Sequence, residues 1–189
     1  KGFEMAGYHI LLGVDFNAPA LKTYEANHKG SKTLCGDLSS LETFPIIDSL
    51  VGDNKVDIII GGPPCQGFSL TGPRNFEDER NKLYLAMIEA IKRYKPKAFV
   101  IENVPGMATL YKGEVKKEII KRLTAMGYEV SCQILCAADY GVPQMRKRLV
   151  FVGLKNGETF DFPTPTHAPD TYITCEQAIG DLPSLETSL

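Results

Sequence analysis

The chain has 189 residues, of which 43% are hydrophobic and 23% charged, with a formal net charge of −2 and a pI near 6.0. This composition is typical of one globular domain with a real core, and no apolar run approaches the ~20 residues of a membrane-spanning helix. The weakly acidic charge gives no electrostatic sign of a nucleic-acid partner. Five scattered cysteines without paired metal-ligand spacing predict no zinc site, and they favour reduced thiols in the cytoplasm over a secreted protein.

Strand and helix patterns alternate along the chain. Strands are predicted at residues 8–14, 33–37, 56–60, 98–101, 129–135 and 149–154. Helices are predicted at 18–27, 41–50, 82–94 and 114–126, with a short helix at 178–183. This alternation predicts an α/β fold with a mostly parallel, doubly wound sheet and helices on both of its faces. We expect one domain at 1–163, followed by an irregular tail or linker at 164–189.

A stiff loop is predicted at 61–69, directly after the apolar strand at 56–60. Its first two glycines allow backbone geometries that other residues resist, and its two prolines fix φ and lack a donor N–H. Cys65 would then lie at the tip of a loop at the carboxyl end of a strand, where open α/β sheets bind ligands. An arbitrary free cysteine is more often an inert buried residue, but a rigidly presented thiol is typical of a nucleophile. The Gly-Gly-Pro-Pro frame favours the nucleophile.

Three acidic residues, Asp15, Asp37 and Glu102, also lie at the carboxyl ends of predicted strands. If those strands are parallel, the acids and Cys65 converge on one edge of the sheet, although each acid is also a common turn-forming residue. An acid after the second strand of a Rossmann-like unit typically binds ribose hydroxyls, and Phe16 has the shape to stack on an adenine. Glu102 follows four apolar residues, so we expect partial desolvation to raise its pKa and let it act as a general acid.

The stretch 144–148 leads into the predicted strand at 149–154. Residues two apart in an extended chain face the same way, so we expect Gln144, Arg146 and Arg148 to share one face. Such a row suits a phosphate, a carbonyl oxygen or a carboxylate as its partner, and the alternative is the solvated end of a strand.

Four stretches, in the same order, resemble motifs of the cytosine-5 DNA methyltransferases. They are Gly-Phe-Glu at 2–4 with Gly7, Pro-Pro-Cys-Gln at 63–66, Glu-Asn-Val at 102–104 and Gln-Met-Arg-Lys-Arg at 144–148, and the stretch 139–143 matches as well. The resemblance covers nearly the whole chain. It implies the Rossmann-like fold of S-adenosylmethionine-dependent methyltransferases, with an antiparallel strand near the C-terminal end. It also implies a protein of the bacterial cytoplasm, associated with the nucleoid, or of the nucleus.

The resemblance implies a role for each matching residue. Cys65 is similar to the nucleophile that adds to C6 of cytosine, and Glu102 is similar to the acid at N3. Arg146 is similar to the residue that contacts the base carbonyl oxygen, and Arg148 to a supporting arginine. S-adenosylmethionine would contact Phe3, Asp15 at its ribose, Phe16 at its adenine, Asp37 with Leu38 at the adenine edge, Pro63 and Leu83. Substrate contacts would come from Gln66, Ser69, Asn103 and Gln144.

The implied reaction is methylation of C5 of a cytosine that has been flipped out of double-stranded DNA. C5 becomes nucleophilic only after sulfur adds at C6 and N3 gains a proton. The chain departs from the family pattern in two ways: only the tail of the first glycine-rich motif is present, and nothing after Asp181 resembles a target recognition domain. We therefore expect a catalytic core that is incomplete at its N-terminus, with DNA recognition supplied by a further segment or a second chain.

Three other functions stay open. The first is methylation of cytosine in tRNA by an enzyme of the same family. The second is a non-catalytic regulator that uses the fold to bind a partner methyltransferase, although such a scaffold needs none of Cys65, Glu102 and Arg146. The third is another Rossmann-like enzyme with a nucleotide cofactor, for which no complete Gly-x-Gly-x-x-Gly is present.

Overall fold

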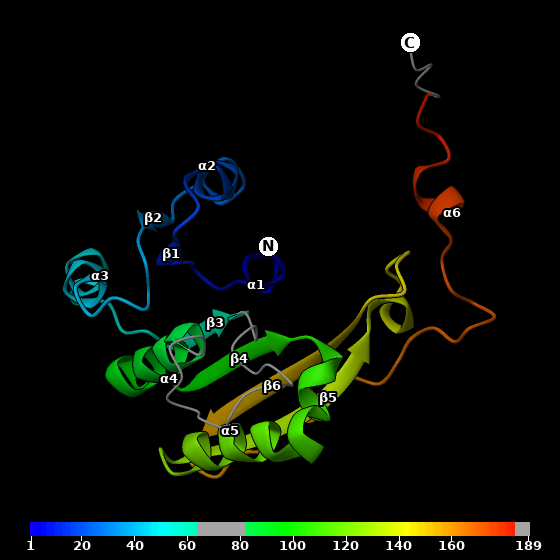
Figure 1. Ribbon diagram of the computed structural model, residues 1–189. Coiled ribbons are helices and arrows are strands. Elements are labelled where there is room, and N and C mark those ends of the chain that lie inside the picture. The colour runs from blue at the N-terminus through cyan, green and yellow to red at the C-terminus, as the bar shows by residue number, and fades with distance from the viewer. Residues whose placement is uncertain (64–81, 184–189) are drawn as a thin grey trace. The chain divides into compact units, whose positions relative to one another are not determined.

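The computed structural model of the protein describes residues 1–63 and 82–183, and the chain divides into two compact units, Lys1–Phe99 and Val100–Leu189 (Figure 1). Within the described ranges, none of the helices has the length and apolarity that crossing a bilayer requires. The domain boundary expected between residues 163 and 164 stays a prediction.

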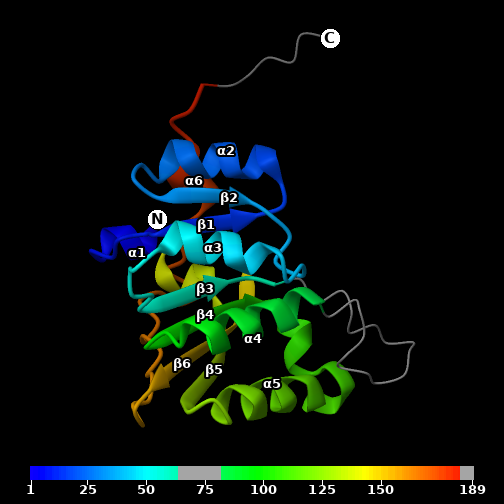
Figure 2. The same cartoon turned by 90° about the vertical axis from the view of Figure 1, so that its left-hand side faces the viewer.

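The first unit begins with alternating short helices and strands. Its elements are helix α1 (Gly2–Met5), strand β1 (Leu12–Asp15), helix α2 (Ala18–Asn27), strand β2 (Lys32–Cys35), helix α3 (Thr43–Val51), strand β3 (Ile58–Gly61), helix α4 (Lys82–Tyr94) and the start of strand β4 (Ala98–Asn103). β1 and β2 pair in parallel, and α2 and α3 lie on opposite faces of the pair (Figure 2). The predicted parallel pairing with helices on both faces is confirmed here.

Side chains on the two faces of β1 explain how the helices pack. On one face, a Cβ at Gly13 would lie 2.7 Å from the Tyr24 ring, so only glycine lets α2 approach β1 this closely. On the other face, α3 buries an apolar row against the strands. That cluster consists of Phe44, Ile47 and Val51, packed against Leu12, Val14, Leu34, Leu38, Val56, Ala90 and Tyr94.

The carboxylate of Asp48 joins α3 to α4. Its Oδ1 accepts a hydrogen bond from Arg93 Nε at 3.0 Å and from the Tyr94 hydroxyl at 2.8 Å. The Arg93 guanidinium also lies over the Phe44 ring, 5.8 Å from its centroid. The hydrogen bonds from Arg93 hold the pKa of Asp48 below its usual range, and burial together with the bond to Asp48 raises the pKa of Tyr94 to about 12.

Asp48→Asn is expected to lower the midpoint of thermal unfolding at pH 7. The fall should be at most about 4 °C, because the pair is solvent-accessible and screened. Since the pKa of Asp48 is lowered by folding, its stabilisation is full above the unfolded pKa and is lost as pH falls. The difference between wild type and Asp48→Asn should therefore shrink below about pH 5. A difference that stays constant down to pH 3, or an equal loss in the exposed control Asp53→Asn, would contradict this role.

The second unit is built around an antiparallel hairpin. It contains the rest of β4, the 3₁₀ helices η2 (Pro105–Ala108) and η3 (Leu110–Gly113), helix α5 (Glu114–Thr124), strand β5 (Tyr128–Cys136), the 3₁₀ helix η4 (Ala137–Tyr140), strand β6 (Lys147–Lys155) and helix α6 (Cys175–Ile179). The strands lie in the order β4-β6-β5, and β5 pairs antiparallel with β6, with Cys136 opposite Lys147. The antiparallel strand expected near the C-terminal end is therefore confirmed. α5 packs along β5 through Val115, Ile119 and Leu123, all of them buried (Figure 1).

Several predicted boundaries shift for local reasons. The strand expected at 8–14 begins only at Leu12, because the Tyr8 N–H still bonds to the Phe3 carbonyl at the end of α1. The helix expected at 41–50 begins at Thr43, which puts Pro45 in its first turn, where no N–H is needed. The short helix expected at 178–183 lies at Cys175–Ile179, since Thr174 and Gln177 form a capping box.

Hydrogen bonding among the described strands forms two ladders. β1 and β2 are hydrogen-bonded only to each other. The second ladder contains four strands in the order β3-β4-β6-β5. The expected convergence of Asp15 and Asp37 with Glu102 and Cys65 at one sheet edge therefore stays a prediction. Most of the stiff loop predicted at 61–69, including Cys65, lies outside the described residues.

Candidate active site

Glu102 and two arginines form an ion-pair cluster in the second unit. Arg148 Nε lies 2.6 Å from Glu102 Oε1, and Arg146 Nη2 lies 3.6 Å from the same oxygen. Glu102 is the last residue but one of β4, and the two arginines flank Lys147, the first residue of the neighbouring strand β6. Of the three partners considered for the basic row, the structure therefore shows a carboxylate.

The two arginines differ in their freedom to move. The Arg148 side chain is 26% exposed, and its Nη1 also donates to the Lys147 carbonyl at 2.8 Å, so it is held on two sides. The Arg146 side chain is 48% exposed and makes the longer contact, which leaves it able to turn toward a ligand. Arg148 is therefore the more tightly held of the two arginines, and the roles expected for both stay predictions.

The prediction that residues 144–148 form one extended row is wrong for its first residues. β6 begins at Lys147, and Gln144 and Arg146 lie in the loop before it. Their N–H groups bond to the carbonyls of Val142 at 2.7 Å and Gln144 at 2.8 Å, so the backbone is turned rather than extended. Gln144 is exposed in this loop, and its expected substrate contact stays a prediction.

The surroundings of Glu102 are more polar than expected. Its side chain is 42% exposed, and its carboxylate is paired with the guanidinium groups of Arg146 and Arg148. The sequence had led us to expect apolar surroundings. The next residue, Asn103, is 4% exposed, and its Oδ1 accepts the N–H of Val104 at 2.9 Å. Asn103 therefore holds the turn after β4, and its expected contact with substrate stays a prediction.

The predicted cofactor residues of the first unit lie at the carboxyl ends of β1 and β2. Asp15 ends β1, and its Oδ1 accepts the Asn17 N–H at 2.8 Å. Phe16 follows with 69% of its surface exposed, and Asp37 lies two residues after β2, where its Oδ1 accepts the Ser39 N–H at 2.8 Å. Because β1 and β2 are parallel neighbours, both acids leave the sheet at the same edge.

Other predicted cofactor contacts are placed only in part. Leu38 is half-buried beside the Phe44 cluster, which fits an apolar wall. Phe3 lies in α1, and its ring makes an edge contact with Tyr8 at 5.5 Å between centroids. Pro63 is the last described residue before the gap, and Leu83 lies in the first turn of α4. Cys65, Gln66 and Ser69 lie outside the described residues.

Asn17 caps a helix in the structure, a role that was not predicted from the sequence. Its Oδ1 accepts the Ala20 N–H at 2.9 Å and so caps α2, while its N–H donates to Asp15. Asparagine two residues before a proline is a recognisable helix start, and this signal was available in the sequence. The cap fixes the turn in which Asp15 and Phe16 are presented.

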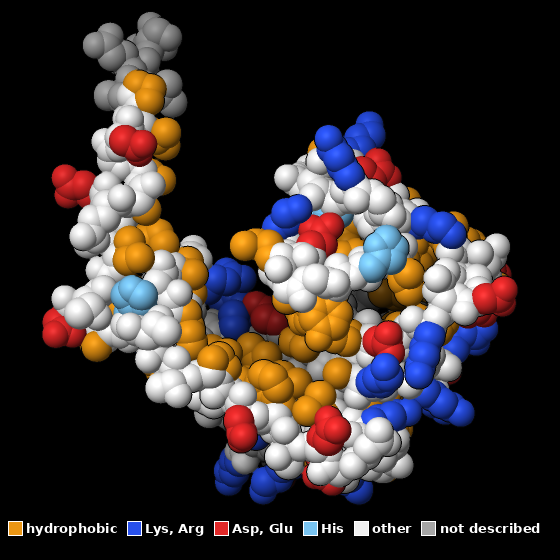
Figure 3. All heavy atoms as spheres, turned by 180° about the vertical axis from the view of Figure 1, so that it is seen from behind, with side chains coloured by type: hydrophobic (Ala, Val, Ile, Leu, Met, Phe, Trp, Pro, Cys, Tyr) orange, Lys and Arg blue, Asp and Glu red, His pale blue; other side chains and the backbone are white. Residues whose placement is uncertain are grey.

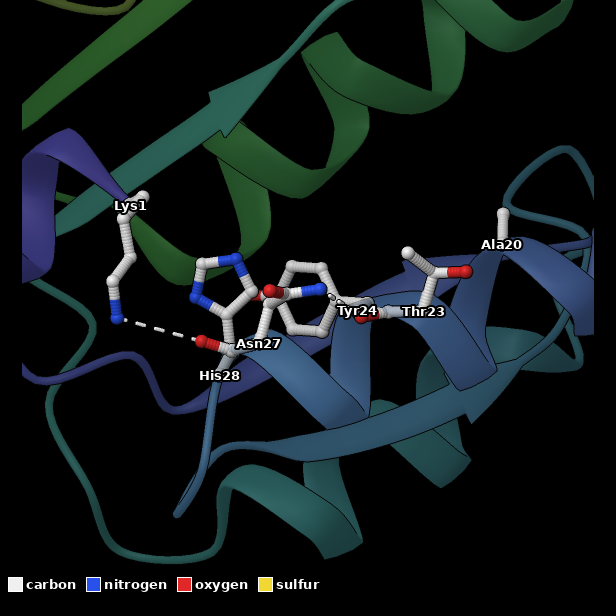
Figure 4. A pocket seen from close by; sticks show the side chains of 6 residues that line it. All are labelled: Lys1, Ala20, Thr23, Tyr24, Asn27 and His28. Carbon is white, nitrogen blue, oxygen red and sulfur yellow. Dashed lines mark hydrogen bonds between the residues drawn. The ribbon is translucent and has the colours of Figure 1, made fainter. Parts of the chain in front are cut away.

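A shallow hollow of about 480 Å³ lies along α2, and none of the residues that line it was predicted as a site residue (Figure 4). It is lined by Lys1, Ala20, Thr23, Tyr24, Asn27 and His28. His28 stacks on Tyr24 at 4.2 Å between ring centroids, and its Nδ1 lies 2.9 Å from Glu4 Oε2. These contacts join α1 to α2, and the hollow is formed where the two helices pack together. We assign it no role in function.

The charged side chains on the face seen in Figure 3 are of both signs and interspersed, in line with the net charge of −2. No broad basic surface is visible on that face among the described residues.

In its fold the chain is similar to methyltransferases of known structure. The chain is similar to the crystal structure of a putative DNA modification methyltransferase from a prophage of E. coli, with a TM-score of 0.77 and 29% identity over 95% of this chain and 50% of that one. It is also similar to the structure of Spodoptera frugiperda DNMT2, with a TM-score of 0.65 and 25% identity over 87% of this chain and 49% of that one.

The sequence defines the family more narrowly. Residues 1–188 match the family described as C-5 cytosine-specific DNA methylase, and the chain belongs to that family. It is 42% identical over 187 residues to the Type II methyltransferase M1.HphI of Haemophilus parahaemolyticus, a match that covers 97% of this chain and 50% of M1.HphI. Over 192 residues it is 39% identical to the Type II methyltransferase M.DdeI of Desulfomicrobium norvegicum, covering 98% of this chain and 46% of that protein. The chain thus spans about half the length of these relatives.

Proposed function

We propose that the protein transfers a methyl group from S-adenosylmethionine to C5 of cytosine in double-stranded DNA, through a covalent adduct between Cys65 and C6. The observation that carries this proposal is the cluster of Glu102, Arg146 and Arg148, in a chain that belongs to the C-5 cytosine-specific DNA methylase family. A scaffold protein has no need of a carboxylate held between two arginines, which speaks against the regulatory alternative.

The carboxyl ends of β1 and β2 fit the nucleoside half of the cofactor. Oδ1 of Asp15 accepts the Asn17 N–H, and the second carboxylate oxygen supplies a further acceptor for ribose hydroxyls. Phe16 offers an exposed ring for the adenine, and Asp37 with Leu38 borders the adenine edge. When bound, the cofactor supplies the methyl group; these residues bind and orient it.

The cytosine chemistry falls to the other residues. The Cys65 thiol gives its proton to solvent, and its sulfur adds to C6 of the flipped base. Glu102, which is ion-paired with the two arginines before the base enters, takes up a proton from solvent and delivers it to N3, so that no negative charge builds up on the ring. Arg146 donates to the base carbonyl oxygen, while Arg148 holds the Glu102 carboxyl group. The enamine that results has a nucleophilic C5. After methylation, a water molecule takes the C5 proton, the Cys65 sulfur leaves as a thiolate, and N3 returns its proton to Glu102, which restores the neutral aromatic base.

The test is methyl transfer by the complete protein from radiolabelled S-adenosylmethionine to duplex DNA and, separately, to tRNA. We expect label in 5-methylcytosine of the DNA only. Label in tRNA alone would replace the proposal by the tRNA alternative. Label in neither, with the cofactor bound and a partner protein captured, would favour the regulator.

Asp15→Ala is expected to weaken binding of S-adenosylmethionine more than it lowers kcat at saturating cofactor. Hydrogen bonds to ribose are equally present in the ground and transition states, so their loss affects binding rather than chemistry. Loss of hydrogen bonds to a charged group corresponds to a rise in Kd of roughly 10–100-fold. Calorimetry gives the Kd, and steady-state kinetics gives kcat. Asp15→Asn is the matched control, because it keeps the acceptor for the Asn17 N–H. A large fall in kcat with an unchanged Kd would contradict the ribose role.

A further inference from the structure

The chain after β6 returns to the loop that joins β5 to β6, residues 137–146. The N–H groups of Thr166 and His167 donate to the Asp139 carbonyl at 2.9 and 3.0 Å. The Tyr172 hydroxyl donates to the Asp139 side chain, Oδ1, at 2.5 Å. The Thr166 hydroxyl also donates to the Asp139 carbonyl, at 3.4 Å. Asp139 thus accepts four hydrogen bonds from one segment, which Figure 1 shows running past η4 to α6. These contacts, all within the second unit, tie the loop to the segment 163–175.

Two further contacts strengthen this tie. The Tyr140 hydroxyl donates to the Pro163 carbonyl at 3.0 Å, and the Cys175 thiol lies 3.5 Å from the Pro143 carbonyl. At Gly141, where φ is +81°, a Cβ would lie 2.9 Å from the His167 ring. Only glycine both adopts this backbone conformation easily and leaves room for the ring. The segment therefore packs along the outer side of the loop.

The same loop carries Arg146. At the base of the loop the Ala137 N–H donates to the Arg146 carbonyl at 2.8 Å, and the Val142 N–H returns to the Ala137 carbonyl at 3.2 Å. Ala138 is buried, so the η4 turn is anchored in the core. Asp139 is one residue further on. Asp139 is thus connected to Arg146 through the short backbone stretch to Ala137 and the hydrogen bond from the Ala137 N–H to the Arg146 carbonyl. A displacement of Asp139 would therefore displace the backbone of Arg146.

We propose that Asp139 and Tyr172 are positioning residues: their hydrogen bond fixes the 137–146 loop so that Arg146 reaches the flipped base. This inference rests on the proposed function. The bond is charge-assisted and short, which gives it directional strength. The bond to Asp139 raises the pKa of Tyr172 to about 12, so the hydroxyl stays a donor throughout the working pH range. A bond that only anchored the tail would contribute to stability and leave the chemistry unchanged.

Tyr172→Phe removes the hydroxyl and little else. In the complete protein we expect it to slow covalent adduct formation with duplex DNA containing 5-fluorocytosine by roughly tenfold, the effect of losing one hydrogen bond to a charged group. Affinities for S-adenosylmethionine and for the duplex should stay as in wild type, since Arg146 meets the base only after flipping. Asp139→Ala should act as Tyr172→Phe does, and Asp139→Asn, which keeps an acceptor, should restore part of the rate.

The matched control is Tyr94→Phe, which removes a tyrosine–aspartate bond of the same kind, to Asp48 in the first unit. It should lower thermal stability and leave the adduct rate unchanged. Equal rate losses in Tyr94→Phe and Tyr172→Phe would overturn the positioning role.

A double-mutant cycle separates this inference from the proposed function. If Tyr172 acts through Arg146, Tyr172→Phe should have no further effect on the adduct rate in an Arg146→Ala background. Additive losses, or a wild-type rate in Tyr172→Phe, would overturn the positioning role while leaving the proposed function intact. A wild-type rate in Arg146→Ala alone would instead overturn the proposed role of Arg146.

Discussion

Cys65→Ser is expected to abolish both methyl transfer and covalent trapping while the protein stays folded and binds its cofactor. Serine is nearly isosteric with cysteine, but its hydroxyl is a far weaker nucleophile near neutral pH. Because adduct formation precedes every later step of the proposed reaction, its loss cannot be compensated elsewhere. Product formation in radiolabelled methyl transfer should fall below detection.

The matched control for this variant is Cys132→Ala. Burial raises the pKa of the Cys132 thiol on β5, so this sulfur remains a protonated, inert thiol. Cys132→Ala should keep the wild-type rate of transfer, apart from any loss of stability. Near-normal activity of Cys65→Ser would rule out Cys65 as the nucleophile.

Glu102→Gln is expected to slow formation of the adduct at C6 by about 10²–10⁴-fold, the usual contribution of general acid catalysis. Glutamine keeps the shape and can donate a hydrogen bond to N3, but it cannot deliver a proton. Base binding should therefore survive, and the effect should be seen in the rate of adduct formation rather than in duplex affinity. Rapid quenching of the reaction with 5-fluorocytosine DNA gives this rate directly.

The structure supplies a matched control for Glu102→Gln as well. Glu118 pairs with Arg122 at 3.0 Å on α5, with side chains 28% and 31% exposed, so Glu118→Gln removes a comparable glutamate–arginine pair. It should leave the adduct rate unchanged. If Glu102→Gln also reacts at the wild-type rate, then Glu102 is a structural acid at a strand end, and the proposed activation of cytosine is wrong.

Much of the fold follows from local patterns in the sequence. The helix at Ala18–Asn27 has a proline in its first turn, and the helix at Lys82–Tyr94 has an apolar face, so both are found with the predicted bounds. Strand ends were harder, since the start of β1 depends on how α1 ends, and α1 itself was not predicted. Short-range periodicity carries no information about such contacts.

The site could be predicted in composition but not in geometry. The acid near the end of β4 and the two arginines before and after Lys147 were found from their positions in the chain. That Arg148 rather than Arg146 makes the close contact with Glu102 depends on the turn at 144–146, which an extended pattern could not reveal. The tie from Tyr172 to Asp139 spans 33 positions, and a pairing at that separation has no signature in one sequence.

The most direct test of the central claim is to trap the adduct and locate it. The complete protein is incubated with S-adenosylmethionine and duplex DNA in which the target cytosine is replaced by 5-fluorocytosine. Fluorine takes the place of the C5 proton and cannot be removed by a base, so the Cys65 sulfur stays bonded to C6. We predict a denaturation-resistant complex, and peptide mass spectrometry should find the modified nucleotide on Cys65. A complex formed through another residue, or no complex under conditions in which the protein methylates ordinary DNA, would contradict the account.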